Sequence, residues 1–134
     1  MKKFICAVLC ILLAAGLSAC GGNVDNAATH AVDSEIYSQK EIDAAINVIK
    51  KEFGRSWNGC TLTEIYYAGD EISLAHQAWA DRDDADQVIV LTSSFDVDAS
   101  GGDGSLNPNS TYDNWSWILV RSGGGKWRHV DHGY

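Results

Sequence analysis

Residues 38–54 read SQKEIDAAINVIKKEFG, and this stretch decides the fold. Ser38 followed three positions later by Glu41 is the capping-box pattern, which predicts that a helix begins after Ser38. Apolar side chains then recur at intervals of three and four, so they share one face of the helix, and Gly54 can end it. Such a face needs a second apolar surface to pack against. The apolar face of this helix consists of Ile42, Ala45, Ile46, Ile49 and Phe53.

Outward from this helix, four segments are predicted to be strands. Residues 60–67 are rich in β-branched and aromatic residues, and residues 87–97 contain the apolar run VIVL, which suits a central strand. Residues 115–121 and 126–131 flank SGGG, which is a good hairpin signal. Residues 71–80 fit both the helical and the strand period, and their alanine-rich composition favours a helix.

This order of elements predicts an α+β fold. We expect an antiparallel sheet of about four strands with one or two helices packed on one face, similar in outline to a cystatin or a nuclear transport factor. Trp115, Trp117, Leu119 and Arg121 alternate onto one face of their strand, where the first helix can cover them. Core packing of the tryptophans is favoured over stacking on sugars, which stays an alternative. Arg121 is expected at the edge of this face, stacked on a ring or paired with an acid.

The first twenty residues differ from the rest. A basic start, a long apolar run and LSAC at residues 17–20 have the layout of a secretory signal. LSAC resembles the bacterial lipobox, which implies cleavage before Cys20 and lipid on its thiol. We expect a lipoprotein signal peptide at residues 1–19, lipidated Cys20 with a flexible tether at residues 20–34, and one globular domain at residues 35–134. Membrane lipid would then hold the protein on the extracytoplasmic side of the cell membrane.

Charge and cysteine content limit the partners. After cleavage, 8 basic residues remain against 18 acidic ones, a net charge of −10. Such a charge disfavours nucleic acid and a polybasic contact with anionic lipid. Apart from Cys20, only Cys60 remains, so no intramolecular disulfide is expected and Cys60 is predicted to be a small buried residue.

The polar, glycine-rich loop before the third predicted strand holds candidate ligands. Asp96, Asp98, Ser100 and Gly101 match the first positions of a calcium loop, and Asp103 can add an oxygen ligand. The pattern lacks its closing glutamate, so the alternative is an acidic loop whose aspartates cap turns, with no cofactor.

The same loop is the predicted recognition surface, because a loop of this length in a small domain is often functional. Its candidate binding residues are Asp103, Asn107, Asn109 and Tyr112. Near the C-terminus, His129 and Asp131 are expected to face one way and His132 the other, as on a regular strand, which disfavours a shared metal site.

Residues 88–134 resemble the C-terminal block of a group of small lipoproteins from Gram-positive, clostridia-like bacteria. The specific parts are the loop SGGDGSLNPNSTY at residues 100–112 and the ending W-x-W-x-L-x-R…W-x-x-V-x-x-G-Y. The resemblance implies a lipid-anchored protein and assigns no catalytic residue.

No nucleophile motif surrounds the serines or Cys60, so no catalytic residue is named. The leading prediction is a membrane-anchored, extracytoplasmic binding module without enzymatic activity, whose ligand is cell-wall glycan, a peptide or another envelope protein. Two alternatives stay open: an extracytoplasmic hydrolase whose residues converge only in the fold, and a regulatory or structural partner of a membrane protein.

Overall fold

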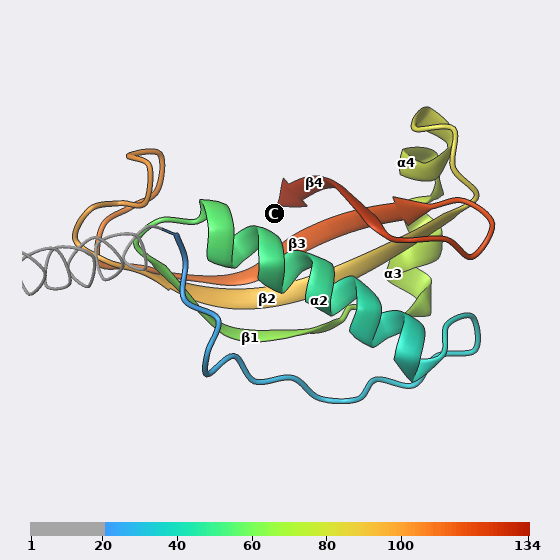
Figure 1. Ribbon diagram of the computed structural model, residues 1–134, viewed down its shortest axis with the longest axis horizontal. Helices are drawn as coiled ribbons and strands as arrows, with labels where there is room; N and C mark the ends of the chain where they lie inside the picture. Colours follow the sequence, from blue (N-terminus) through green and yellow to red (C-terminus); the bar gives the residue numbers. More distant parts are fainter. Residues whose placement is uncertain (1–20) are drawn as a thin grey trace, which may run out of the picture.

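The computed structural model describes residues 21–134 (Figure 1). The predicted signal peptide and Cys20 lie outside the described residues. The elements, in chain order, are α2 (Gln39–Ser56), β1 (Cys60–Tyr67), α3 (Asp70–Ala75), α4 (Gln77–Arg82), β2 (Gln87–Val97), β3 (Thr111–Arg121) and β4 (Arg128–Gly133).

The four strands form one antiparallel sheet in the order β1-β2-β3-β4, which confirms the predicted α+β class. The finer likeness to a cystatin or a nuclear transport factor stays a prediction. The two longest strands, β2 and β3, lie at the centre, as the apolar run in β2 predicted.

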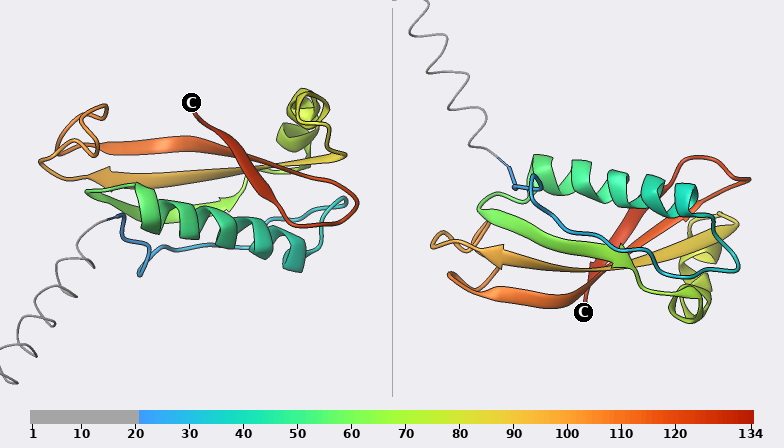
Figure 2. Two further views of the ribbon diagram at one scale, coloured as in Figure 1. Left: turned by 45° about the horizontal axis from the view of Figure 1, so that its top comes forward. Right: turned by 90° about the horizontal axis from the view of Figure 1, so that it is seen from below.

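Helix α2 crosses one face of the sheet (Figures 1 and 2). Its capping box is complete, because Ser38 accepts from the Glu41 amide while the Glu41 carboxylate accepts from the Ser38 amide. All five predicted apolar residues are buried in the core beneath it. Main partners from the sheet are Leu62, Ile65, Ile89, Leu91, Trp117 and Leu119.

Helices α3 and α4 pack at one end of the opposite face (Figure 2), whereas the prediction from the sequence had the helices on one face only. The apolar run of β2 explains the difference. Ile89 faces α2, while Val88 and Val90 face away from it and contact Ala80 of α4. A strand that is apolar on both faces needs cover on both. The predicted single helix is broken at His76, which separates α3 from α4.

Side chains replace strand pairing where β2 extends beyond β1. The Val90 amide donates to the Ser73 hydroxyl at 3.0 Å, and the Tyr37 hydroxyl donates to the Val88 carbonyl. Both residues are buried, as is Ser73, so these bonds satisfy backbone groups that water cannot reach.

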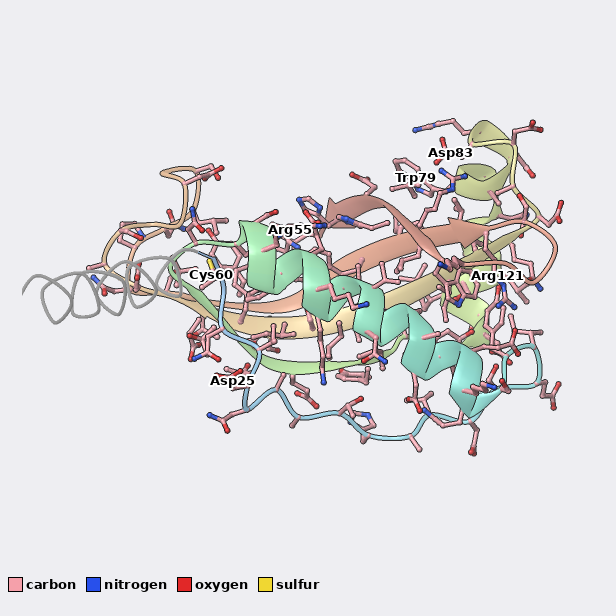
Figure 3. The ribbon with its side chains drawn as sticks, in the orientation of Figure 1. Asp25, Arg55, Cys60, Trp79, Asp83 and Arg121 are labelled. Carbon is pink, nitrogen blue, oxygen red and sulfur yellow. The ribbon has the colours of Figure 1, made fainter. Side chains whose placement is uncertain are left out.

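At the start of α2, Arg121 is buried against three partners. It forms an ion pair with Glu41, and its guanidinium lies 4.2 Å from the centre of the Trp127 ring and 5.8 Å from that of Tyr37. Arg121 was expected either to stack on a ring or to pair with an acid, and in the structure it does both. Figure 3 places Arg121 and Cys60 toward opposite ends of α2.

Residues 21–34 do not form the predicted free tether but lie along the outer edge of β1 (Figure 2). Asn23 exchanges backbone hydrogen bonds with Cys60 and Leu62 at 2.9 and 2.8 Å, and Ala28 bonds Thr63 and Ile65, each at 2.9 Å. An edge strand offers unpaired backbone groups to any extended neighbour, whatever its side chains. The polar composition of the segment therefore gave no sign of this pairing.

Candidate functional site

A cavity of about 290 Å³ opens where α2 ends. Trp57 and Trp115 form aromatic walls, and their ring centres lie 5.9 Å apart at nearly a right angle. Loop residues Asp103, Ser105 and Leu106 complete the lining on one side, together with Asn58, Cys60 and His132.

The cavity exists because the sheet continues past the end of the helix. Trp57 is the C-cap residue of α2, and its amide donates to the Phe53 carbonyl at 3.1 Å. Its ring stacks on Phe53 at 5.5 Å and stays half-buried beyond the last turn. The packed aromatic rings of the core therefore continue beyond the last turn of α2, where Trp57 is partly exposed to solvent.

An irregularity in β3 turns a second pair of rings toward the same end. The register between β2 and β3 shifts next to Asn114, whose φ of 56° is left-handed. Tyr112 and Trp115 consequently both contact Phe95, with ring centres at 5.2 and 5.4 Å. Regular alternation would have separated residues three apart onto opposite faces.

A second bulge corrects the prediction for the C-terminal histidines. Leu119 pairs with His129 while Ile118 pairs with Asp131, so Val130 is the extra residue. The bulge puts His129 and His132 on the α2 face and Asp131 on the other, the reverse of the predicted sharing. The prediction assumed a regular strand, and this was wrong.

The imidazole of His132, which lines the cavity, meets that of His129. Nδ1 of His132 lies 3.2 Å from Nε2 of His129, within hydrogen-bond distance. Both rings pack against Trp117, at 5.2 and 5.4 Å between centres. Burial, and then the neighbouring His132, lower the pKa of His129. The pair therefore favours a neutral His129 at physiological pH.

Cys60 is buried, as predicted, at the back of the cavity. Burial, followed by the charges of Asp98 and Asp103, raises the pKa of its thiol. The thiolate is the nucleophilic form, so these surroundings make Cys60 a poor nucleophile. The buried Ser93 is also engaged: it donates to the Trp115 carbonyl and accepts from the Trp117 indole.

The four residues proposed for calcium do not converge. The Asp98 carboxylate accepts from the amide and hydroxyl of Ser100, and Asp96 accepts from Thr111 on the neighbouring strand. Asp103 sits in a turn of its own, where it accepts from Ser105. Across residues 21–134, no three His, Cys, Asp or Glu side chains gather in a way that could hold a metal ion.

Of the four predicted binding residues, Asp103 alone lines the cavity. The Tyr112 hydroxyl accepts from the Asn107 amide at 3.1 Å, which fixes the loop against the aromatic cluster. Asn109, with a φ of 52°, donates its amide to the Asp98 carbonyl at 2.9 Å. Asn107, Asn109 and Tyr112 therefore shape the loop, and Asp103 faces the cavity.

Trp115 carries an unpaired polar group. Its Nε1 is buried and has no hydrogen-bond partner within the described part of the chain. An unpaired buried donor costs about 1–3 kcal/mol, so proteins rarely leave one without a reason.

Sequence reasoning missed the role of Trp57, Asn58, Ser105, Leu106 and His132 as neighbours in one cavity. One signal was present: Trp57 lies three residues beyond Gly54, where the helix was expected to end, so its ring was not expected to lie under that helix. The structure extends the helix to Ser56 and makes Trp57 its C-cap. The place of His132 depends on the bulge in β4, which no local pattern marks. Asn58, Ser105 and Leu106 lie in loops that meet only in the folded chain.

Comparisons with protein-family models, with curated proteins and with solved structures find no match for this chain. Among residues 21–134, no helix has the length and apolar character needed to cross a membrane.

Proposed function

We propose that this protein is a lipid-anchored, extracytoplasmic binding module, and that its cavity binds a neutral sugar group of the cell envelope. The observation that carries the sugar proposal is the cavity itself, where two indole walls meet a rim of short polar side chains. The lipobox-like sequence before Cys20 carries the proposed location.

The lining suits a sugar in both its parts. Aromatic faces pack against the apolar C–H face of a sugar ring, as Trp57 and Trp115 would, while carboxylate and amide groups bond its hydroxyls. Asp103 binds Ser105 through Oδ1 only, so Oδ2 has no partner among the described residues.

Size and charge narrow the ligand. A cavity of about 290 Å³ is at the lower end of the range for small-molecule sites, which suits one or two sugar rings. The lining contains Asp103 and neither lysine nor arginine, so an anionic ligand would meet like charge without a counter-ion. A neutral sugar fits this chemistry better than a phosphorylated or acidic one.

The chemistry around Cys60 and Ser93 favours binding over hydrolysis. The Cys60 thiol has a raised pKa, and the Ser93 hydroxyl already bonds Trp115 and Trp117. Nucleophilic catalysis needs an activated group within reach of a base, and neither residue has that arrangement.

The binding proposal is tested by titrating the protein with the β-1,4-linked tetramer of N-acetylglucosamine and following tryptophan fluorescence and heat. We expect saturable binding in the wild type and a loss of about tenfold in affinity for Trp115→Phe, which replaces one indole wall of the cavity by a smaller ring. Trp79→Phe is the matched control, because Trp79 lies in α4, outside the cavity lining (Figure 3). Absence of heat and fluorescence change at millimolar sugar would refute the sugar proposal.

The proposed location is tested separately. Cys20→Ser should move the protein out of the membrane fraction, and mass spectrometry of the native protein should find acyl chains at Cys20. Unchanged membrane association without acyl chains would refute the anchor.

A further inference from the structure

The first described residues dock at the cavity end of the domain. The Gly22 amide donates to the Phe53 carbonyl at 3.1 Å, and the Trp57 amide donates to the same carbonyl at 3.1 Å. The Phe53 carbonyl oxygen therefore accepts hydrogen bonds both from the start of the described chain and from Trp57, a wall of the cavity.

Two glycines make this contact feasible. A Cβ at Gly21 would lie 2.1 Å from the Gly54 carbonyl oxygen, and one at Gly22 would lie 2.5 Å from the Phe53 oxygen. Gly21 also has a φ of +112°, which other residues rarely adopt. The glycines thus permit close backbone contact with the end of α2 instead of acting as a flexible spacer.

The chain stays attached beyond this point. The Asn23 amide donates to the carbonyl of Cys60, a residue that lines the cavity. Further along the segment, Ala28 continues the backbone pairing with β1. In Figure 2 the segment leaves the last turn of α2 and follows β1 toward the other end of the sheet. Hydrogen bonds from Gly22 to α2 and from Asn23 to β1 therefore fix the start of the described chain relative to the cavity.

We infer, building on the proposed lipidation of Cys20, that the cavity end of the domain faces the bilayer and that its ligand is the neutral sugar headgroup of a membrane glycolipid. Consecutive Cα atoms are about 3.8 Å apart, so a lipid on Cys20 begins one residue from the docked Gly21. The anchor holds the Trp57 end at the membrane surface, and the Arg121 end points away from it (Figure 3).

The negative charge at the cavity end favours uncharged lipid headgroups over phosphate-bearing ones. Asp25, Asp98 and Asp103 lie at this end, on the linings of the cavity and of an adjoining open groove, and these linings contain no lysine or arginine. Acidic side chains repel phosphate-bearing headgroups over about a Debye length, roughly 8 Å at physiological salt. An uncharged sugar headgroup meets no such barrier.

The orientation is tested on mature lipidated protein reconstituted in phosphatidylcholine vesicles that carry an acceptor fluorophore on a lipid. Donor dyes are placed at Ser105→Cys, by the cavity, or at Ser122→Cys, in the β3–β4 hairpin; buried Cys60 is common to both. The 18 residues of α2 separate the two ends by about 27 Å. We expect energy transfer to be roughly two-fold or more stronger from position 105. Equal transfer, or stronger transfer from position 122, would overturn the inference.

A matched pair of variants tests the docked segment as the cause. Gly22→Val should clash with Phe53 and bring the two transfer signals together, whereas the exposed Thr29→Val in the same segment should leave the difference intact. If Gly22→Val keeps the full difference, docking at α2 does not set the orientation.

The ligand is tested with the same vesicles. Adding a neutral glucosyl diacylglycerol should change the tryptophan fluorescence of the wild type and not of Trp115→Phe, and adding phosphatidylglycerol should not. A response to the free tetrasaccharide without one to the glycolipid would refute the membrane-borne ligand and leave the sugar proposal standing. Protein that carries no lipid at all would refute the anchor, and with it this inference.

Discussion

The two ends of α2 differ in how far their polar and aromatic groups are satisfied. At the first end, Arg121 is covered by Trp127 and paired with Glu41, and the Trp127 indole donates to the Glu41 carbonyl at 3.1 Å. At the last end, Trp57 and Trp115 border a cavity, and the Trp115 indole has no partner in the described chain. One end is closed by its own side chains, and at the other end the aromatic side chains border an open cavity.

This difference separates stability from binding. A closed polar network rigidifies and specifies a fold, because each group removed leaves another one buried without a partner. Aromatic walls around a cavity contribute less to the stability of the fold and more to the affinity for a ligand. Substitutions at the first end should therefore change the free energy of unfolding, and those at the last end should change affinity.

The largest effect is expected from Glu41→Ala. It removes the side-chain acceptor of the Ser38 amide, which is half of the capping box, and leaves the Arg121 charge buried without its partner. Urea denaturation should show a loss of about 2–4 kcal/mol, below the upper range for buried pairs because the Glu41 side chain is 33% exposed. The exposed Asp43→Ala, which loses only a bond from Gln39, should stay within about 0.5 kcal/mol.

Acid should produce the same loss in the wild type. Hydrogen bonds from the Ser38 amide and then from Arg121 lower the pKa of Glu41 from 4.5 to about 2. The stabilisation is therefore complete above pH 4.5 and disappears as the pH falls toward 2. Wild type and Glu41→Ala should converge over that window, and a constant gap would show that the charge of Glu41 is not what stabilises the closed end.

Next in size is Ser73→Ala, also away from the cavity. The variant leaves the buried Val90 amide without its acceptor, which costs about 1–3 kcal/mol. Denaturant unfolding should detect this loss, and sugar affinity should not change. Ser122→Ala, in the exposed hairpin, is the control, and an equal effect there would contradict the role given to Ser73.

A smaller, pH-dependent effect is expected at the cavity end. Because the pKa of His129 is lowered from 6.5 in the fold, the unfolded chain binds a proton first as the pH falls. The free energy of unfolding should be highest above pH 6.5 and decrease below it, by at most about 1.4 kcal/mol per pH unit. His129→Gln should flatten this slope, and His30→Gln should keep it, because His129 remains.

Asp103→Asn should have the smallest effect on stability and a clear one on binding. Asp103 is exposed and bonds only its own turn, so the urea midpoint of unfolding should stay close to that of the wild type. If its carboxylate binds sugar hydroxyls, calorimetry should show roughly tenfold weaker binding. Asp113→Asn, which is exposed on β3 outside the cavity lining, is the matched control.

Much of the fold could be predicted from local pattern. The capping box at Ser38, the apolar face of α2 and the hairpin before β4 are properties of a few neighbouring residues, and the structure has them all. That Arg121 shares the α2 face with Trp117 and Leu119 followed from strand alternation, because β3 is regular from Trp117 onward. Its individual partners, Glu41 and Trp127, were not predicted.

The site could not be predicted in the same way. Asn114 and Val130 each interrupt the alternation of a strand, so Tyr112 joins Trp115 and His132 joins His129 on one face. A bulge depends on the pairing partner as much as on its own sequence. The path of residues 21–34 was missed for a related reason, since backbone pairing at an edge leaves no signature in side chains.

That path has a consequence for handling the protein in the laboratory. Residues 23 and 28 occupy backbone positions on β1 that would otherwise be open to another molecule. A fragment starting at residue 35, the domain boundary expected from the sequence, would uncover an unprotected strand on which chains can pair and aggregate. Expression from residue 21 keeps that strand covered, so the added fourteen residues reduce pairing of β1 between copies of the chain.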